Sequence, residues 1–353
     1  MTQQAPYGEA DGLVRVYPAD VATARPTAGL VWAHGGGFAA GDLDMPEADW
    51  VARAFAGRGL TVVSIDYRLV GDGSGRYPAG SDDVLAAWRW TFTHADDLDV
   101  DPARVLIGGA SAGANLVTGA VLRLLGHPVF GGGTGQPTAP SAYTDSAGGA
   151  PAPGAAPEVA QETRAPSAAS TRLPAGVFLA YPTLLAVQPA PDEALRALLD
   201  ANPDADRFGP ARVLEMYENY VRGPVDDAPL PAVPGRASPA DVMGFPPVLM
   251  VNGEADELRV SGEAFAATLA RAGVPVEVVT EPGTEHGHLN RPHEPAACVT
   301  VDRVIDWLPT LGGRVAAQPR TETGPLGLDT AAKRPTRPPE ELTTLRITEG
   351  ITP

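Results

Sequence analysis

The feature that most constrains the fold of this chain is the regular alternation of short apolar runs with longer segments of helical periodicity. Buried parallel strands appear in a sequence as continuous apolar runs, and parallel neighbours need a long crossover, usually a helix, between them. The pattern therefore predicts an α/β fold with a mostly parallel central sheet and helices on both faces. We expect buried strands at Gly29–Ala33, Leu60–Asp66, Arg104–Gly108, Gly176–Ala180, Pro247–Val251 and Val274–Thr280. We expect helices at Glu47–Gly57, Ser81–Phe92, Ala112–Leu125, Glu257–Ala272 and Pro295–Leu308.

Two stretches have a composition that builds no core. Gly131–Thr171 is mostly Gly, Ala, Pro, Ser and Thr with one aromatic residue, and Gly313–Pro353 is rich in Pro, Thr and charge. Such segments bury too little apolar surface to offset the entropy lost on ordering. We therefore predict one large α/β domain over residues 1–312, interrupted by a disordered insert at 131–171 and followed by a flexible tail at 313–353.

Charge and cysteine content narrow the function classes. The formal net charge of −17 argues against nucleic acid, which needs a basic surface. Cys298 is the single cysteine, so no internal disulfide can form, and its apolar helical setting predicts a buried position. We see no signal peptide and no run of about 20 apolar residues, and we expect a cytoplasmic protein without a membrane span.

One serine lies in an unusually tight corner between a predicted strand and a predicted helix. The segment VLIGGASAGANLV places Ser111 at the centre of Gly-x-Ser-x-Gly. In one interpretation, the small residues merely let strand and helix pack closely. In the other, the glycines make room for a strained turn that raises a nucleophilic hydroxyl, a nucleophile elbow.

Three further loops follow predicted strands at the same edge of the sheet, where ligands gather in parallel α/β folds. Asp256 follows one strand; it could be a helix N-cap or a catalytic acid, with Glu254 and Glu257 as rival acids. His286 and His288 follow the last strand, and either could be a base or a surface residue. The order Ser, Asp, His is that of an α/β-hydrolase triad.

A run of three glycines, His34-Gly35-Gly36-Gly37-Phe38, follows the first predicted strand. Glycines leave backbone N–H groups bare and free to adopt unusual dihedral angles. The run is either a flexible turn or a loop that aims donors at a developing oxyanion.

With these motifs the chain resembles the bacterial hormone-sensitive-lipase-like esterases of the α/β-hydrolase fold. The resemblance spans about 30–308 and includes HGGGF, DYRL, YPAG, GASAGANL, SPADVMGFPPVLMVNGEADELR and AGVPVEVVTEPGTEHGH. It implies Ser111 as nucleophile, Asp256 as acid and His286 as base. It also implies an oxyanion hole formed by the backbone N–H groups of Gly36, Gly37 and Ala112, with His34 shaping the loop.

The chain departs from the family pattern at several positions. The family usually has an acidic residue at Ala110, glycine at Ala114 and an aromatic residue at His288, and DYRL here lacks the usual Ala-Pro-Glu continuation. Only about 28 residues precede the first matched strand, so the resemblance implies a reduced or absent N-terminal cap. Residues 189–223 could supply a partial lid.

The expected function is hydrolysis of small carboxylic esters, of short to medium acyl chains, through an acyl-serine, with no metal and no organic cofactor. Two alternatives remain open from the sequence. The same triad could cleave amides or peptides. The fold could also serve as a non-catalytic ligand-binding protein, as in the plant gibberellin receptor. The sequence does not reveal the oligomeric state.

Overall fold

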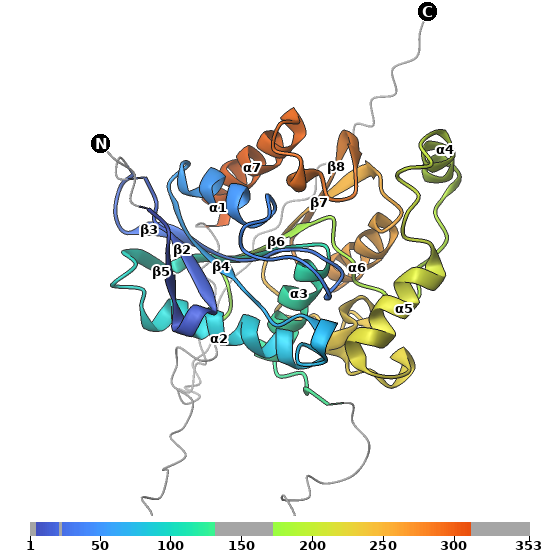
Figure 1. Ribbon diagram of the computed structural model, residues 1–353, viewed down its shortest axis with the longest axis horizontal. Helices are drawn as coiled ribbons and strands as arrows, with labels where there is room; N and C mark the ends of the chain where they lie inside the picture. The colour runs from blue at the N-terminus through green and yellow to red at the C-terminus, as the bar shows by residue number, and fades with distance from the viewer. Residues whose placement is uncertain (1–4, 21–22, 131–171, 312–353) are drawn as a thin grey trace, which may run out of the picture. The chain divides into compact units, whose positions relative to one another are not determined.

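The computed structural model describes residues 5–20, 23–130 and 172–311, and these form an eight-stranded sheet covered by helices (Figure 1). The strand order is β1-β2-β4-β3-β5-β6-β7-β8. β2 runs antiparallel to both of its neighbours. The six strands that follow it in this order, β4, β3, β5, β6, β7 and β8, are parallel to one another. The strands are β1 (Tyr7–Glu9), β2 (Val14–Tyr17), β3 (Thr27–Ala33), β4 (Leu60–Ile65), β5 (Val100–Ala110), β6 (Gly176–Ala180), β7 (Val248–Ala255) and β8 (Val276–Glu285).

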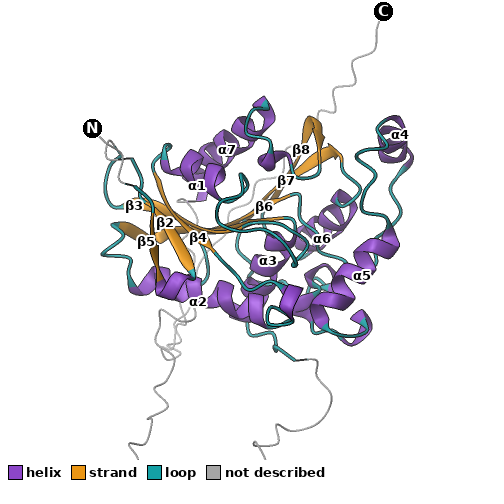
Figure 2. Cartoon of the chain, viewed as in Figure 1, coloured by secondary structure: helices purple, strands orange, loops and turns teal. Residues whose placement is uncertain are grey.

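Helices cover both faces of the sheet (Figure 2). The helices are α1 (Asp49–Ala56), α2 (Ala79–Thr93), α3 (Ala112–Leu124), α4 (Glu193–Ala201), α5 (Pro210–Val221), α6 (Arg259–Arg271) and α7 (Pro295–Trp307). Successive strand side chains alternate between faces. Leu30 and Trp32 of β3 therefore pack in the core under α1 and α7, while Val31 between them packs in the core under α2, α3 and α6.

The register of the parallel strands brings their carboxyl ends to one edge. Ala33 of β3 is level with Ile65 of β4 and with Gly109 of β5, and Ala180 of β6 is level with Ala110 of β5 and with Val251 of β7. The loops that follow these strands therefore meet along this edge.

The six predicted strands and five predicted helices are present, with ends displaced by a few residues. The sequence analysis missed β1 and β2, because YGE and VRVY are too short and polar to show an apolar run. These two strands lie at one edge of the sheet. The described residues before β3 thus form two strands and one 3-10 turn, where a helical cap would otherwise stand.

Two predictions of burial were wrong. β8 was expected to be a buried strand, but it lies at the edge of the sheet and most of its residues are exposed or half-buried, Val278 among them. Cys298 was expected to be buried, but its side chain is exposed. The buried stripe of α7 follows Ala297, Val301 and Val304 at helical spacing, and residue 298 falls outside it.

The predicted insert at 131–171 and tail at 313–353 lie outside the described residues. Of the helices in the described ranges, none is both long and apolar enough to cross a membrane.

Candidate active site

Ser111 occupies a strained turn between β5 and α3. Its backbone has φ 50° and ψ −115°, a region that a residue with a Cβ seldom adopts. A Cβ at Gly113 would overlap the carbonyl oxygens of Ala33 and His34, and one at Gly109 would lie 2.5 Å from the Gly113 carbonyl carbon. Both glycines of the motif are therefore required for the close crossing of strand and helix.

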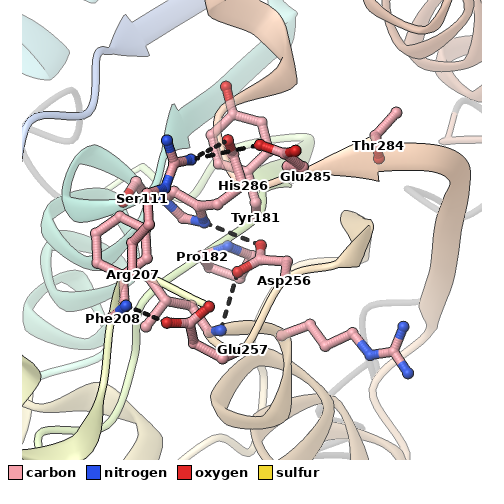
Figure 3. Close-up of polar contacts among 12 residues, drawn as sticks. Ser111, Tyr181, Pro182, Arg207, Phe208, Asp256, Glu257, Thr284, Glu285 and His286 are labelled. Atoms are coloured by element: carbon pink, nitrogen blue, oxygen red, sulfur yellow. Dashed lines mark hydrogen bonds and ion pairs between the residues drawn. The ribbon is translucent and has the colours of Figure 1, made fainter. Parts of the chain in front are cut away.

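The structure brings Ser111, His286 and Asp256 into one hydrogen-bonded chain (Figure 3). His286 Nε2 lies 2.9 Å from Ser111 Oγ, and His286 Nδ1 lies 2.9 Å from Asp256 Oδ2. A carboxylate can only accept, so Nδ1 carries the proton and Nε2 is free to accept from the serine hydroxyl. The other Asp256 oxygen, Oδ1, accepts a bond of 2.9 Å from the Leu258 N–H, so the carboxylate is fixed at both oxygens.

The rival acids point elsewhere. Glu254 Oε2 accepts a hydrogen bond from the N–H of Gly283 in β8, at an exposed position. Glu257 is buried and its Oε1 accepts from the Phe208 N–H, and burial raises the pKa of this carboxyl. Asp256 is thus the acid of the 254–257 segment that contacts His286, while Glu257 ties down the chain before α5.

The rival histidine also points away from the serine. His288 is fully buried and its Nε2 bonds to Thr300 Oγ1 of α7 at 2.9 Å. Burial, with a smaller contribution from Arg291, lowers the pKa of His288 to about 4. The ring is therefore neutral near pH 7.

The glycine loop places Gly36 and Gly37 beside Ser111. Both have positive φ, 124° and 61°, and a Cβ at Gly36 would overlap the Ala40 carbonyl. Among the described residues, no hydrogen bond uses the backbone N–H of Gly36, Gly37 or Ala112. These three donors, from the loop and from the first residue of α3, remain available to a ligand oxygen.

His34 anchors this loop from behind. It is fully buried, its Nδ1 lies 2.7 Å from the Gly35 oxygen, and its ring stacks on Tyr67 with centroids 4.5 Å apart. The Tyr67 hydroxyl donates to the His34 carbonyl oxygen at 2.8 Å. His34 therefore packs under the loop.

Glu47 is a buried carboxylate that the sequence analysis did not single out. Its Oε2 accepts from the Gly35 N–H at 2.5 Å, and its Oε1 accepts from the Tyr181 hydroxyl at 2.5 Å and from Asn290 Nδ2 at 2.9 Å. Burial and this carboxylate raise the pKa of Tyr181 well above its usual value of 10, so the hydroxyl stays a donor. Glu47 therefore links the glycine loop, the end of β6 and the turn after His286. No local sequence signal indicates such a link, since Asn290 is 243 residues away.

A cavity of about 510 Å³ opens over Ser111. One wall is the glycine loop and another is α5, which lies within the segment expected to form a lid. The wall residues from the second half of the chain are Phe208, Arg212, Val213, Glu215, Met216, Asn219, Leu258, His286, Gly287 and Asn290. Within the described residues, no group of three or more His, Cys, Asp or Glu side chains could hold a metal ion.

Comparison with known proteins gives a consistent result. A family model described as "alpha/beta hydrolase fold" matches residues 30–130 and 144–290. Carboxylesterase NlhH of Mycobacterium tuberculosis is 34% identical over 288 residues, which cover 79% of this chain and 73% of that protein. Ethyl acetate hydrolase of Pseudomonas putida is 28% identical and covers 77% and 70%. The solved structure of a bacterial heroin esterase has a TM-score of 0.56 at 26% identity, and covers 82% and 78%.

Proposed function

Because this chain belongs to the hormone-sensitive-lipase-like esterases of the α/β-hydrolase fold, we propose that it hydrolyses small carboxylic esters with Ser111, His286 and Asp256 as its catalytic triad. The observation that carries the proposal is the unbroken hydrogen-bonded chain from Ser111 Oγ to the Asp256 carboxylate. In such a chain the carboxylate holds the imidazole in the tautomer that can accept the serine proton.

The proposed reaction has two stages. His286 Nε2 takes the proton from Ser111 Oγ as the oxygen attacks the ester carbonyl carbon. The resulting oxyanion accepts from the N–H groups of Gly36, Gly37 and Ala112. His286 then gives the proton to the departing alcohol oxygen, leaving an acyl-serine. In the second stage His286 deprotonates a water that attacks the acyl carbonyl, and the carboxylic acid leaves as Ser111 recovers its proton.

We extend the proposal to the 189–223 segment, which would act as a partial lid. Phe208 and five residues of α5 face the cavity, and the Phe208 ring lies edge-on against His286 with centroids 4.8 Å apart. Phe208 would limit water access at His286, and α5 residues beside the glycine loop, such as Met216, would limit the size of the acyl group, so we expect short to medium chains.

The two alternative functions, amide hydrolysis and ligand binding, are separated from ester hydrolysis by different observations. Amide hydrolysis would use the same groups, and comparing an acyl anilide with the matching phenyl ester would reveal it. A binding protein on this fold would tolerate a broken triad. The intact Ser111–His286 hydrogen bond of 2.9 Å favours an enzyme instead.

The deciding experiment is labelling with a fluorophosphonate probe together with p-nitrophenyl ester kinetics. We expect the wild type to react covalently with the probe at Ser111 and to hydrolyse p-nitrophenyl acetate or butyrate. Ser111→Ala should lose both properties while keeping its circular dichroism spectrum and melting temperature. Full activity in Ser111→Ala would refute the nucleophile assignment.

The two histidines provide a matched pair of variants. His286→Ala should be nearly inactive, because no group would then accept the serine proton. His288→Ala should keep most of its activity, because that ring faces Thr300. The reverse ranking of kcat would transfer the base role to His288.

A further inference from the structure

A second hollow adjoins the active-site cavity and is lined by arginines. It has a volume of about 670 Å³, and Arg207, Arg212 and Arg291 lie on its walls. It shares Phe208, Arg212, His286, Gly287 and Asn290 with the cavity over Ser111, so the two are contiguous. We call this second space the arginine hollow. Three positively charged side chains gather there, although the chain as a whole has a net charge of −17.

The arginine hollow directly adjoins His286, which is one of its lining residues. Arg207 Nη2 donates to the His286 carbonyl oxygen at 3.3 Å (Figure 3). The guanidinium groups of Arg207 and Arg212 lie over the Phe208 ring, 5.7 and 6.0 Å from its centroid, and that ring contacts His286. Phe208 is itself held by Glu257 through its N–H. The aromatic ring therefore presents two guanidinium groups beside the imidazole.

Two of these three cations are paired with carboxylates. Arg291 pairs with Glu294 at 2.8 Å, and Arg207 lies 3.9 Å from Glu285. Over the described residues, Arg212 has no ion pair within 4.0 Å, although it lines both spaces. The acidic residue on the same wall, Asp206, is engaged by Arg196 at 2.7 Å.

The position of the arginine hollow relative to His286 indicates which end of a substrate would reach it. The alcohol oxygen that leaves the tetrahedral intermediate must lie within reach of His286 Nε2, because it receives its proton there. The part of the substrate bonded to that oxygen therefore extends on the His286 side, toward Phe208 and Arg212.

We propose that the arginine hollow binds a carboxylate carried by the alcohol portion of the ester, with Arg212 as its principal partner. This inference rests on the proposed esterase function and adds the substrate class to it. A guanidinium matches a carboxylate through two parallel N–H···O bonds, which gives selectivity for that group over a neutral one.

The test compares 4-acetoxybenzoate, which carries the carboxylate on its leaving group, with neutral phenyl acetate. Arg212→Gln should lower kcat/KM for 4-acetoxybenzoate by about threefold to tenfold, the range of a partly exposed charge-assisted pair. The same variant should lower kcat/KM for phenyl acetate less, so the ratio of the two esters reports the carboxylate contact, and its circular dichroism spectrum shows that it is folded. Added salt should weaken the wild-type reaction with the anionic ester only.

Arg89→Gln is the matched control, since it removes the same charge from an exposed site on α2 that lines neither space. It should not change the ratio of the two esters. An Arg212→Gln variant that retains the wild-type ratio would overturn the inference while leaving the esterase proposal intact. The inference would also be overturned if Arg212→Gln lost activity only on an ester with the carboxylate on its acyl chain. The pair of esters for this comparison is p-nitrophenyl hydrogen glutarate and p-nitrophenyl butyrate. A wild type that cleaves none of these esters would refute the esterase proposal itself.

Discussion

At the scale of single residues, the candidate oxyanion loop depends on a carboxylate outside the triad. Three donors surround the Glu47 side chain, namely the Gly35 N–H, the Tyr181 hydroxyl and the Asn290 amide. An anion satisfies all three, since each carboxylate oxygen accepts more than one hydrogen bond. A neutral amide in the same place would point an NH₂ group at one of the donors.

Glu47→Gln should therefore reduce kcat by about tenfold with a smaller change in KM. We expect this because a displaced Gly35 would move the adjacent Gly36 and Gly37 N–H groups, and loss of a single oxyanion donor costs about 10²–10³ in rate. Steady-state kinetics on p-nitrophenyl butyrate measures the split between kcat and KM. An equal loss of folded protein and activity, with normal kcat per folded molecule, would show that Glu47 only stabilises the fold.

His288 predicts a pH dependence of stability. Its pKa is lowered from 6.5 to about 4 in the folded protein, so the unfolded chain takes up this proton at higher pH than the folded one. The stability linked to His288 is therefore complete above pH 6.5 and declines as the pH falls toward 4, by up to about 3 kcal/mol. His288→Phe should flatten the wild-type decline in melting temperature between pH 6.5 and 4. Parallel curves for the two proteins would contradict the burial argument.

At the scale of elements, α5 determines how much space lies above the glycine loop. The Met216 sulfur would lie 3.3 Å from a Cβ at Gly37, so this side chain closes the cavity next to the candidate oxyanion donors. Met216 is half-buried, and replacing it opens the cavity without removing a fully buried core residue.

Met216→Ala should shift the acyl-chain preference toward longer esters. We expect the ratio of kcat/KM for p-nitrophenyl octanoate to that for the acetate to rise by at least about threefold, because new apolar space accepts extra methylene groups. Glu218→Ala, on the exposed side of α5, is the control and should leave the ratio unchanged. An unchanged ratio in Met216→Ala would argue against α5 as the wall that selects acyl length.

At the scale of the whole molecule, the described residues 5–20, 23–130 and 172–311 contribute all the strands of the sheet and every residue of the candidate triad. The composition of 131–171 predicts a segment that adds nothing to the core. Replacing 131–171 with a Gly/Ser linker of about 15 residues should leave kcat/KM unchanged and the melting temperature within about 2 °C. A large fall in either quantity would assign the insert a structural or functional role.

Much of the architecture could be predicted from the sequence because its signals are local. Apolar runs such as the one ending at Ala180 predict strands by themselves. The glycines at 109 and 113 indicate a close crossing because a side chain there would overlap neighbouring backbone. Exposure was harder to predict, as Cys298 and β8 show, because it depends on which elements pack on each side.

The sequence by itself determined the order of strands β3 to β8 and of helices α1, α2, α3, α6 and α7, the close strand–helix crossing at Ser111 and the three loops that could carry an acid, a base and an anion site. Each of these follows from backbone sterics and side-chain periodicity within a few residues. Only the tertiary structure decided that Asp256 and His286, not their neighbours, face a serine 175 residues from the histidine, and that Glu47 and the arginine hollow lie around them. These contacts depend on strand register and on helix packing across the whole sheet, which no single segment encodes.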